Sequence, residues 1–178
     1  MYTMRDMIGD EKVNLALRQF LKKYGDARPP LPTSLDLLAE LRSVTPESLL
    51  YLITDLFETI TLWDVKTDSA AAERTQSGDW RVTLTVTAKK VRADSIGKET
   101  EVPMNDLVQI GVFTEPEQDK ERGEPVYLRM HRVRSGQQKI VVTVPGGAAQ
   151  SLSTAGIDPY HRLIKRERSP SVVSVARG

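Results

Sequence analysis

The chain has 178 residues, enough for one ordinary domain or two small ones, and its 25 basic and 24 acidic side chains nearly cancel. This balance lacks the global positive charge that draws proteins to nucleic acids, so no nucleic-acid partner is expected. Cysteine is absent, which excludes disulfides, thiolate metal sites and a cysteine nucleophile. The longest apolar stretch, near residues 49–53, is far shorter than the ~20 residues that span a bilayer. We expect the chain to be soluble as written, and the sequence does not indicate its compartment.

The first residues are predicted to form two helices. Apolar side chains recur there at the three- and four-residue steps of a helix: Met4, Ile8, Val13, Leu17, Phe20 and Leu21. Gly9 and Asp10 provide a break and a cap between the two helices. Three prolines within residues 24–32 then end helix formation, because each removes a backbone donor.

Two further helices are predicted before residue 60. Thr33, with Asp36 three residues later, is the expected N-cap of the first. Thr45 is the expected cap of the second, and Pro46 suits its first position because the φ angle of proline is already helical. The second helix has a wide apolar band, which indicates burial between neighbouring elements: Leu49, Leu50, Ile53, Leu56 and Phe57.

After residue 60 the apolar pattern changes to period two. Apolar residues alternate with polar ones, as in a half-buried antiparallel strand, at Trp80, Val82, Leu84, Val86 and Ala88. Further strands are predicted at residues 107–113, 126–133 and 139–144. Residues 64–73 are expected to form a hairpin with the Trp80 strand across residues 77–79.

The predicted fold class is α+β. An N-terminal α-helical segment at residues 1–60 precedes a small antiparallel β-sandwich-like domain at residues 61–178, because short strands alternate with regularly spaced turn signals. A locally basic tail starts at Ala155, and we expect it to be solvated or to pack on a partner. Its cations are Arg162, Lys165, Arg166, Arg168 and Arg177.

No catalytic motif is visible in the sequence. A helical zinc site needs two histidines one turn apart with a glutamate between them, and neither His131 nor His161 has such a partner. The nucleophile elbow of a serine hydrolase is absent, and the glycines of residues 144–149 lack the Lys-Ser/Thr of a phosphate-binding loop. We therefore predict no catalytic residue, no metal ligand and no cofactor for this chain.

Two pairs of carboxylates could in principle perform acid-base chemistry. Asp55 and Glu58 are interpreted as an exposed helix stripe that keeps the helix soluble. Glu99 and Glu101 are interpreted as a charged connector between strands.

The candidate binding residues form a cationic strip on the strand predicted at residues 126–133: Arg129, His131, Arg132 and Arg134. Alternation along a strand places Arg129, His131 and Val133 on one face, and Met130, Arg132 and Arg134 on the other. Such a strip could hold a carboxylate. The alternative interpretation is that these charges protect a strand edge against aggregation.

Several separated segments resemble zinc aminopeptidases of the alanyl aminopeptidase (aminopeptidase N-like) family, in the region that follows the active site. The opening MYTMRDMIGDEKVNLALR resembles the helix pair after that site, and PTSLDLL at residues 32–38 resembles the next helix start. Four segments are similar to the bacterial branch in which the peptidase is joined to an ABC-type permease: LFETITL at 56–62, KVRAD at 90–94, ETEVP at 99–103 and AGIDP at 155–159. The tail departs from that pattern, because RSPS stands at residues 168–171 where relatives tend to be acidic.

The resemblance implies that the active site of the complete family member lies outside this chain. Family members bind zinc through a His-Glu-x-x-His helix and a later glutamate, and a tyrosine stabilises the oxyanion. All of these groups are expected upstream of Met1, so no ligand or catalytic residue can be transferred to this sequence. Membrane association is implied only for the complete relative.

Two functions are compatible with these patterns. The preferred hypothesis is a non-catalytic C-terminal segment of a zinc aminopeptidase-like protein, which helps to wall the peptide-binding cleft and packs against the rest of the enzyme or its permease portion. The alternative is a free-standing β-sandwich module that binds a peptide or protein partner. If the chain is a truncated segment, the apolar bands of the helices at residues 1–24 and 45–60 would face missing neighbours, so self-association or poor solubility is expected.

Overall fold

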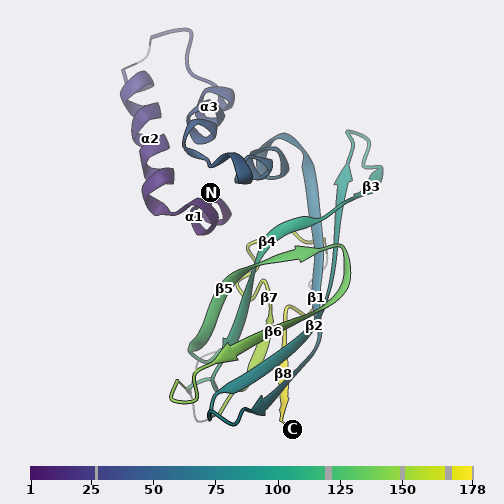
Figure 1. The fold of residues 1–178 in the computed structure, drawn as a ribbon. Coiled ribbons are helices and arrows are strands. Elements are labelled where there is room, and N and C mark those ends of the chain that lie inside the picture. Colours follow the sequence, from purple (N-terminus) through teal and green to yellow (C-terminus); the bar gives the residue numbers. More distant parts are fainter. Residues whose placement is uncertain (27, 119–121, 149–150, 167–169, 178) are drawn as a thin grey trace. The chain divides into compact units, whose positions relative to one another are not determined.

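The computed structural model describes residues 1–26, 28–118, 122–148, 151–166 and 170–177 (Figure 1). The chain divides into two compact units. The helical unit comprises Met1–Thr61 and Ala93–Lys98, and the strand unit comprises Leu62–Arg92 and Glu99–Gly178. Since the helices precede the strands, the α+β prediction is confirmed at this level.

The helical unit begins with the predicted pair of helices, α1 (Tyr2–Ile8) and α2 (Asp10–Tyr24). Gly9 separates them with a φ of 89°, a backbone conformation that costs glycine little and other residues more. Helix α3 (Ser34–Val44) follows, and the helices share one apolar core: Met4, Ile8, Val13, Ala16, Leu41, Leu52 and Ile53. The three- and four-residue spacing thus identified Met4, Ile8 and Val13 as buried, whereas Leu21, predicted on the same face, is 63% exposed.

Helix α3 starts at the predicted cap. Thr33 and Asp36 form a capping box, in which the backbone N–H of Thr33 donates to Asp36 Oδ2 at 2.7 Å. The hydroxyl of Tyr24 donates to the other oxygen of Asp36 at 2.9 Å. These bonds lower the pKa of Asp36, with the Thr33 backbone as the largest cause. The end of α2 is thereby tied to the start of α3.

The prediction of a single helix after Thr45 is wrong, because the structure has three short helical turns there. Thr45 ends α3 with extended dihedrals, as expected for a residue before proline, and its hydroxyl donates to Leu41 O at 2.7 Å. The chain then forms three short turns: the 3-10 turn η1 (Glu47–Leu49), α4 (Tyr51–Ile53) and the π-helical turn η2 (Thr54–Glu58). Pro46 is the N-cap residue of η1, outside the helix, and not its first position.

The interpretation of Asp55 as part of an exposed stripe is also wrong. Asp55 is 1% exposed, and the hydroxyl of Thr61 donates to its Oδ1 at 3.5 Å. Because η2 closes on the Thr59 N–H to Thr54 O bond, its residues do not follow the α-helical period on which the stripe was predicted.

The remaining elements are strands: β1 (Ile60–Arg74), β2 (Trp80–Ala93), β3 (Glu99–Val102), β4 (Asn105–Phe113), β5 (Pro125–Arg134), β6 (Gly136–Val144), β7 (Thr154–Ile157) and β8 (Val172–Arg177). The predicted strands and the hairpin at residues 77–79 are confirmed. The interpretation of Glu99 and Glu101 as a connector is wrong, because both lie in β3.

The strands form one curled, mixed sheet, which corrects the predicted antiparallel sandwich. Their order is β3-β2-β1-β8-β7-β4-β5, with β6 paired to β2. The alternation of β2 is confirmed, because Val82, Leu84 and Val86 are each 0% exposed. In Figure 1 the sheet curls from β1 and β2 on the right toward β5 on the left.

The basic tail predicted from Ala155 onward supplies the strands that join this sheet. Strand β8 pairs with β1 in parallel, with Ala70 opposite Val175, and with β7 in the antiparallel sense. Because β7 also pairs with β4, the two halves expected to face each other as a sandwich are connected edge to edge. Arg168 lies outside the described residues.

Candidate functional site

The four candidate binding residues lie on β5, at one end of the strand order. The register with β4 places His131 opposite Val108 and Arg129 opposite Ile110. Val108 and Ile110 are buried, so Arg129 and His131 share the core-facing side of the sheet. Arg132 and Arg134 point to the opposite face. The strip is therefore divided between two faces, and Val133, predicted to share the first of them, is core with 0% exposure.

The core-facing side of β5 holds a small polar group at the rim of the sheet. His131 Nε2 lies 2.8 Å from the hydroxyl of Tyr127, and the guanidinium of Arg129 lies 5.6 Å from the centre of the Tyr127 ring. Burial, and then the Arg129 charge, lower the pKa of His131. Sequence reasoning missed Tyr127, although its spacing of two and four residues from Arg129 and His131 places it on the same face of a strand.

The opposite face of β5 presents two exposed guanidinium groups. Arg132 Nη1 donates to Asn105 O at 2.9 Å. Arg134 borders an open hollow of about 450 Å³, together with Glu101, Val102, Pro103, Met104 and Ser135. Within the described residues, neither guanidinium has a carboxylate at ion-pair distance.

Around the buried side chains of Asp158 and Ser171, a polar network includes Lys165 and the second histidine, His161, which is itself exposed. The carboxylate of Asp158 accepts hydrogen bonds from the Arg162 N–H at 2.7 Å and lies 3.4 Å from Lys165 Nζ. Lys165 donates to Ser171 Oγ at 2.6 Å, and His161 Nδ1 lies 3.5 Å from the same oxygen. Burial raises the pKa of Asp158 and lowers that of Lys165, against the attraction between the two charges.

A lysine beside a serine hydroxyl can in principle activate a nucleophile. Ser171, however, is only 4% exposed, and its carbonyl accepts hydrogen bonds from Thr67 Oγ1 at 2.6 Å and from the Ile157 N–H at 2.9 Å. A substrate could not reach this buried oxygen, so a catalytic role does not fit. We interpret the network as a structural clamp, whose hydrogen bonds hold β1, β7 and the start of β8 together.

A second buried ion pair has a similar structural role. Lys90 Nζ lies 3.0 and 3.1 Å from the two oxygens of Asp106, and Trp63 Nε1 donates to Asp106 at 2.8 Å. These residues come from β2, β4 and β1, so the pair connects strands that are distant in the sequence. Each polar atom named here has a partner, as burial of charge requires.

The described residues contain neither a cluster of metal-ligating side chains nor a membrane-spanning helix. Among them, no group of three or more histidine, aspartate or glutamate side chains is placed to hold a metal ion. In the same part of the chain, no helix has both the length and the apolar character needed to cross a bilayer.

Exposed apolar side chains are concentrated in the helical unit. Of the twelve large apolar residues that are exposed in the described chain, nine belong to it: Met1, Tyr2, Leu15, Leu21, Leu31, Leu35, Phe57, Ile60 and Ile96. The longer strand unit exposes Val141, Tyr160 and Ile164. Single exposed apolar residues are normal on any protein, but their concentration in the smaller unit marks its surface as a candidate interface.

Comparison with known proteins gives this chain no family. No family model and no curated protein matches it. Among solved structures, a β-glucosidase from Listeria innocua in complex with glucose matches with a TM-score of 0.31 and 11% identity over 65% of this chain. The chain spans 16% of the length of that protein. A likeness at this level carries no argument about the function of the chain described here.

Proposed function

We propose that this chain is a non-catalytic C-terminal segment of a larger zinc aminopeptidase-like protein. Its helical unit packs against the remainder of that protein and helps to wall the peptide-binding cleft. Its strand unit packs on the same protein or on a permease portion. The observation that carries this proposal is the concentration of exposed apolar side chains in the helical unit.

The physical reason is the cost of leaving these side chains in water. Leu21, Leu31 and Leu35 are 63, 66 and 72% exposed, and Ile96 is 86% exposed. Burial of apolar surface contributes about 25 cal/mol per Å². A neighbour that covered several such side chains would therefore stabilise the association by several kcal/mol. Such an exposed apolar surface is expected of a segment that another part of the same protein normally covers.

The resemblance of the separated segments supplies the identity of the neighbour. They occur in the same order as in the family, and the region that they resemble follows the zinc site. A chain with this placement would contribute packing and cleft wall, while the zinc-bound part supplies the chemistry.

The coding sequence immediately upstream tests this proposal. We expect an in-frame segment that encodes a His-Glu-x-x-His helix, a later glutamate and a tyrosine close to Met1. An unrelated gene at that place would contradict the proposal.

The purified chain provides a second test of the non-catalytic role. We expect no release of amino-terminal residues from peptide substrates, with or without added zinc, because the expected ligands are not in this sequence. Release that depends on zinc and stops with a chelator would contradict the assignment.

A further inference from the structure

We propose that the free edge of β5 binds an extended acidic peptide segment by strand addition. This inference goes beyond the packing of the helical unit and does not depend on it. It rests on two features of β5: backbone groups that point away from the sheet, and guanidinium groups that have no carboxylate partner among the described residues.

In the part of the chain that the structure describes, strand β5 has a neighbouring strand on one side only. It pairs with β4, whereas β6, the next strand along the chain, pairs with β2. No strand in the described part of the chain pairs along the other side of β5. The edge therefore offers a row of backbone donors and acceptors to another chain.

Two contacts establish which backbone groups face this edge. The Ser135 N–H donates to Met104 O at 3.3 Å, and these two residues flank the opposed pair Asn105 and Arg134. In an antiparallel ladder such a flanking bond means that the opposed residues do not hydrogen-bond to each other. The backbone of Arg134 consequently points away from β4. The side-chain amide of Gln138 confirms this direction, because it donates to Arg134 O at 2.8 Å and lies 3.5 Å from Arg134 N.

The amide of Gln138 occupies the place of a neighbouring strand at the hairpin end of β5. Backbone direction alternates along a strand, so the N–H and C=O groups of Leu128, Met130 and Arg132 point to the same side as those of Arg134. Among the described residues, none forms a hydrogen bond with these groups on that side. The bindable edge therefore extends from Leu128 to Arg132.

The charges at this edge select the chemistry of the partner. Arg129 contacts the ring of Tyr127, and Arg132 donates to a backbone carbonyl, but within the described residues neither has a carboxylate partner. Arg134 likewise has no ion pair among these residues. Guanidinium groups match carboxylates with two parallel hydrogen bonds, so an acidic peptide fits this edge better than a neutral one.

The division of the strip between two faces suits an added strand. Side chains of a strand alternate between faces, so adjacent glutamates of a bound peptide would meet Arg129 on one side and Arg132 or Arg134 on the other. A second copy of β5 is disfavoured as the occupant, because pairing two such edges would bring arginines against arginines.

The test uses a fluorescein-labelled peptide of sequence VTEETEEV and its analogue with glutamine in place of glutamate, measured by fluorescence anisotropy against the full chain. The combined variant Arg129→Gln, Arg132→Gln, Arg134→Gln is expected to bind the acidic peptide at least about tenfold more weakly than the parent. The matched control Lys12→Gln, Arg18→Gln, Lys22→Gln removes the same charge from α2 and should leave the affinity within about twofold.

Two N-methylated versions of the acidic peptide separate strand addition from simple charge attraction. One carries methyl groups on the odd amides and the other on the even amides. Only one set of amides faces β5 in an added strand, so one version should lose binding and the other should keep it. Equal binding of both versions, equal weakening by the two variants, or equal binding of the glutamine peptide would overturn the proposal.

Discussion

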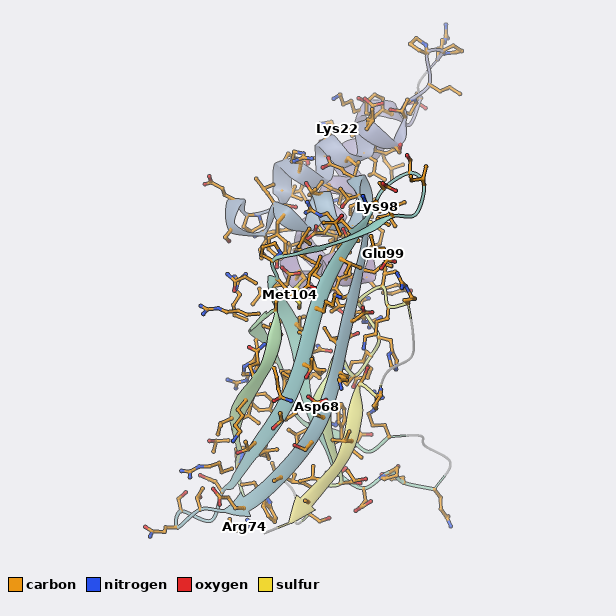
Figure 2. All side chains as sticks on the ribbon, turned by 90° about the vertical axis from the view of Figure 1, so that its right-hand side faces the viewer. Lys22, Asp68, Arg74, Lys98, Glu99 and Met104 are labelled. Atoms are coloured by element: carbon orange, nitrogen blue, oxygen red, sulfur yellow. The ribbon has the colours of Figure 1, made fainter. Side chains whose placement is uncertain are left out.

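Asp68 shows how a surface carboxylate can be fixed by its neighbours on three strands. Lys66 Nζ lies 2.8 Å from Asp68 Oδ1, and Thr87 and Gln137 donate to Oδ2 at 2.5 and 3.2 Å. Figure 2 labels Asp68 part of the way along the β1–β2 hairpin, above Arg74 near the turn. These bonds, with that of Lys66 as the largest cause, lower the pKa of Asp68 to about 2.

The pKa of Asp68 predicts a pH-dependent contribution to stability. In the folded state the pKa is about 2, whereas an unfolded aspartate titrates near 3.9. The stabilisation is therefore present above about pH 4 and is lost as the pH falls toward 2. Asp68→Asn should lower the free energy of unfolding in urea at pH 7 and have a smaller effect at pH 3. Asp26→Asn, in an exposed loop, is the charge control, and an equal effect of Asp68→Asn at both pH values would contradict the assignment.

Individual residues were predictable where local spacing decides their environment. Thr33 and Asp36 form the expected cap because the capping box depends on only four consecutive residues. Asp55 was mispredicted because its burial depends on a π-helical turn and on Thr61 beyond it. The faces of β5 followed from alternation, but the sequence could not show that the first face is the core side.

At the scale of elements, β7 and β8 were missed because both are short and lie in a basic segment. Their positions are set by pairing with β4 and β1, which are distant in the sequence. Without β7 and β8, the remaining strand pattern predicts two antiparallel layers, which is why a sandwich was expected. The longer strands were predictable because a period of two depends only on local residues.

The buried ion pair between Lys165 and Asp158 predicts that substitutions of these two residues have non-additive effects on the free energy of unfolding. Lys165→Met should lower the free energy of unfolding by about 3 kcal/mol, because it leaves the buried carboxylate of Asp158 without its partner charge. Adding Asp158→Asn should recover much of that loss, since asparagine keeps an oxygen for the Arg162 N–H and carries no charge.

Urea unfolding of the parent, both single variants and the double variant forms a complete cycle for this pair. A double variant that is destabilised by the sum of the single effects would show that the two charges do not interact. The network would then not act as the clamp described here.

At the scale of the whole molecule, the sequence predicted helices followed by strands, and the structure has that order. The proposed role depends on surface that no local pattern reveals. Periodicity identified apolar faces on α1 and α2, but the exposed fractions of Leu15 and Leu21 depend on how the helices pack. A partner for this surface can be demonstrated only by covering or removing it.

The most direct test of the proposed packing role measures the mass of the purified chain by light scattering as its concentration rises. We predict self-association of the parent chain through the helical unit, because its exposed apolar side chains are covered only by another molecule. The variant Leu15→Gln, Leu21→Gln, Leu35→Gln should remain a monomer. The control variant Val141→Gln, Ile164→Gln, which changes two exposed apolar residues of the strand unit, should associate like the parent. A parent chain that stays monomeric at every concentration would contradict the proposed role of the helical unit as a docking surface.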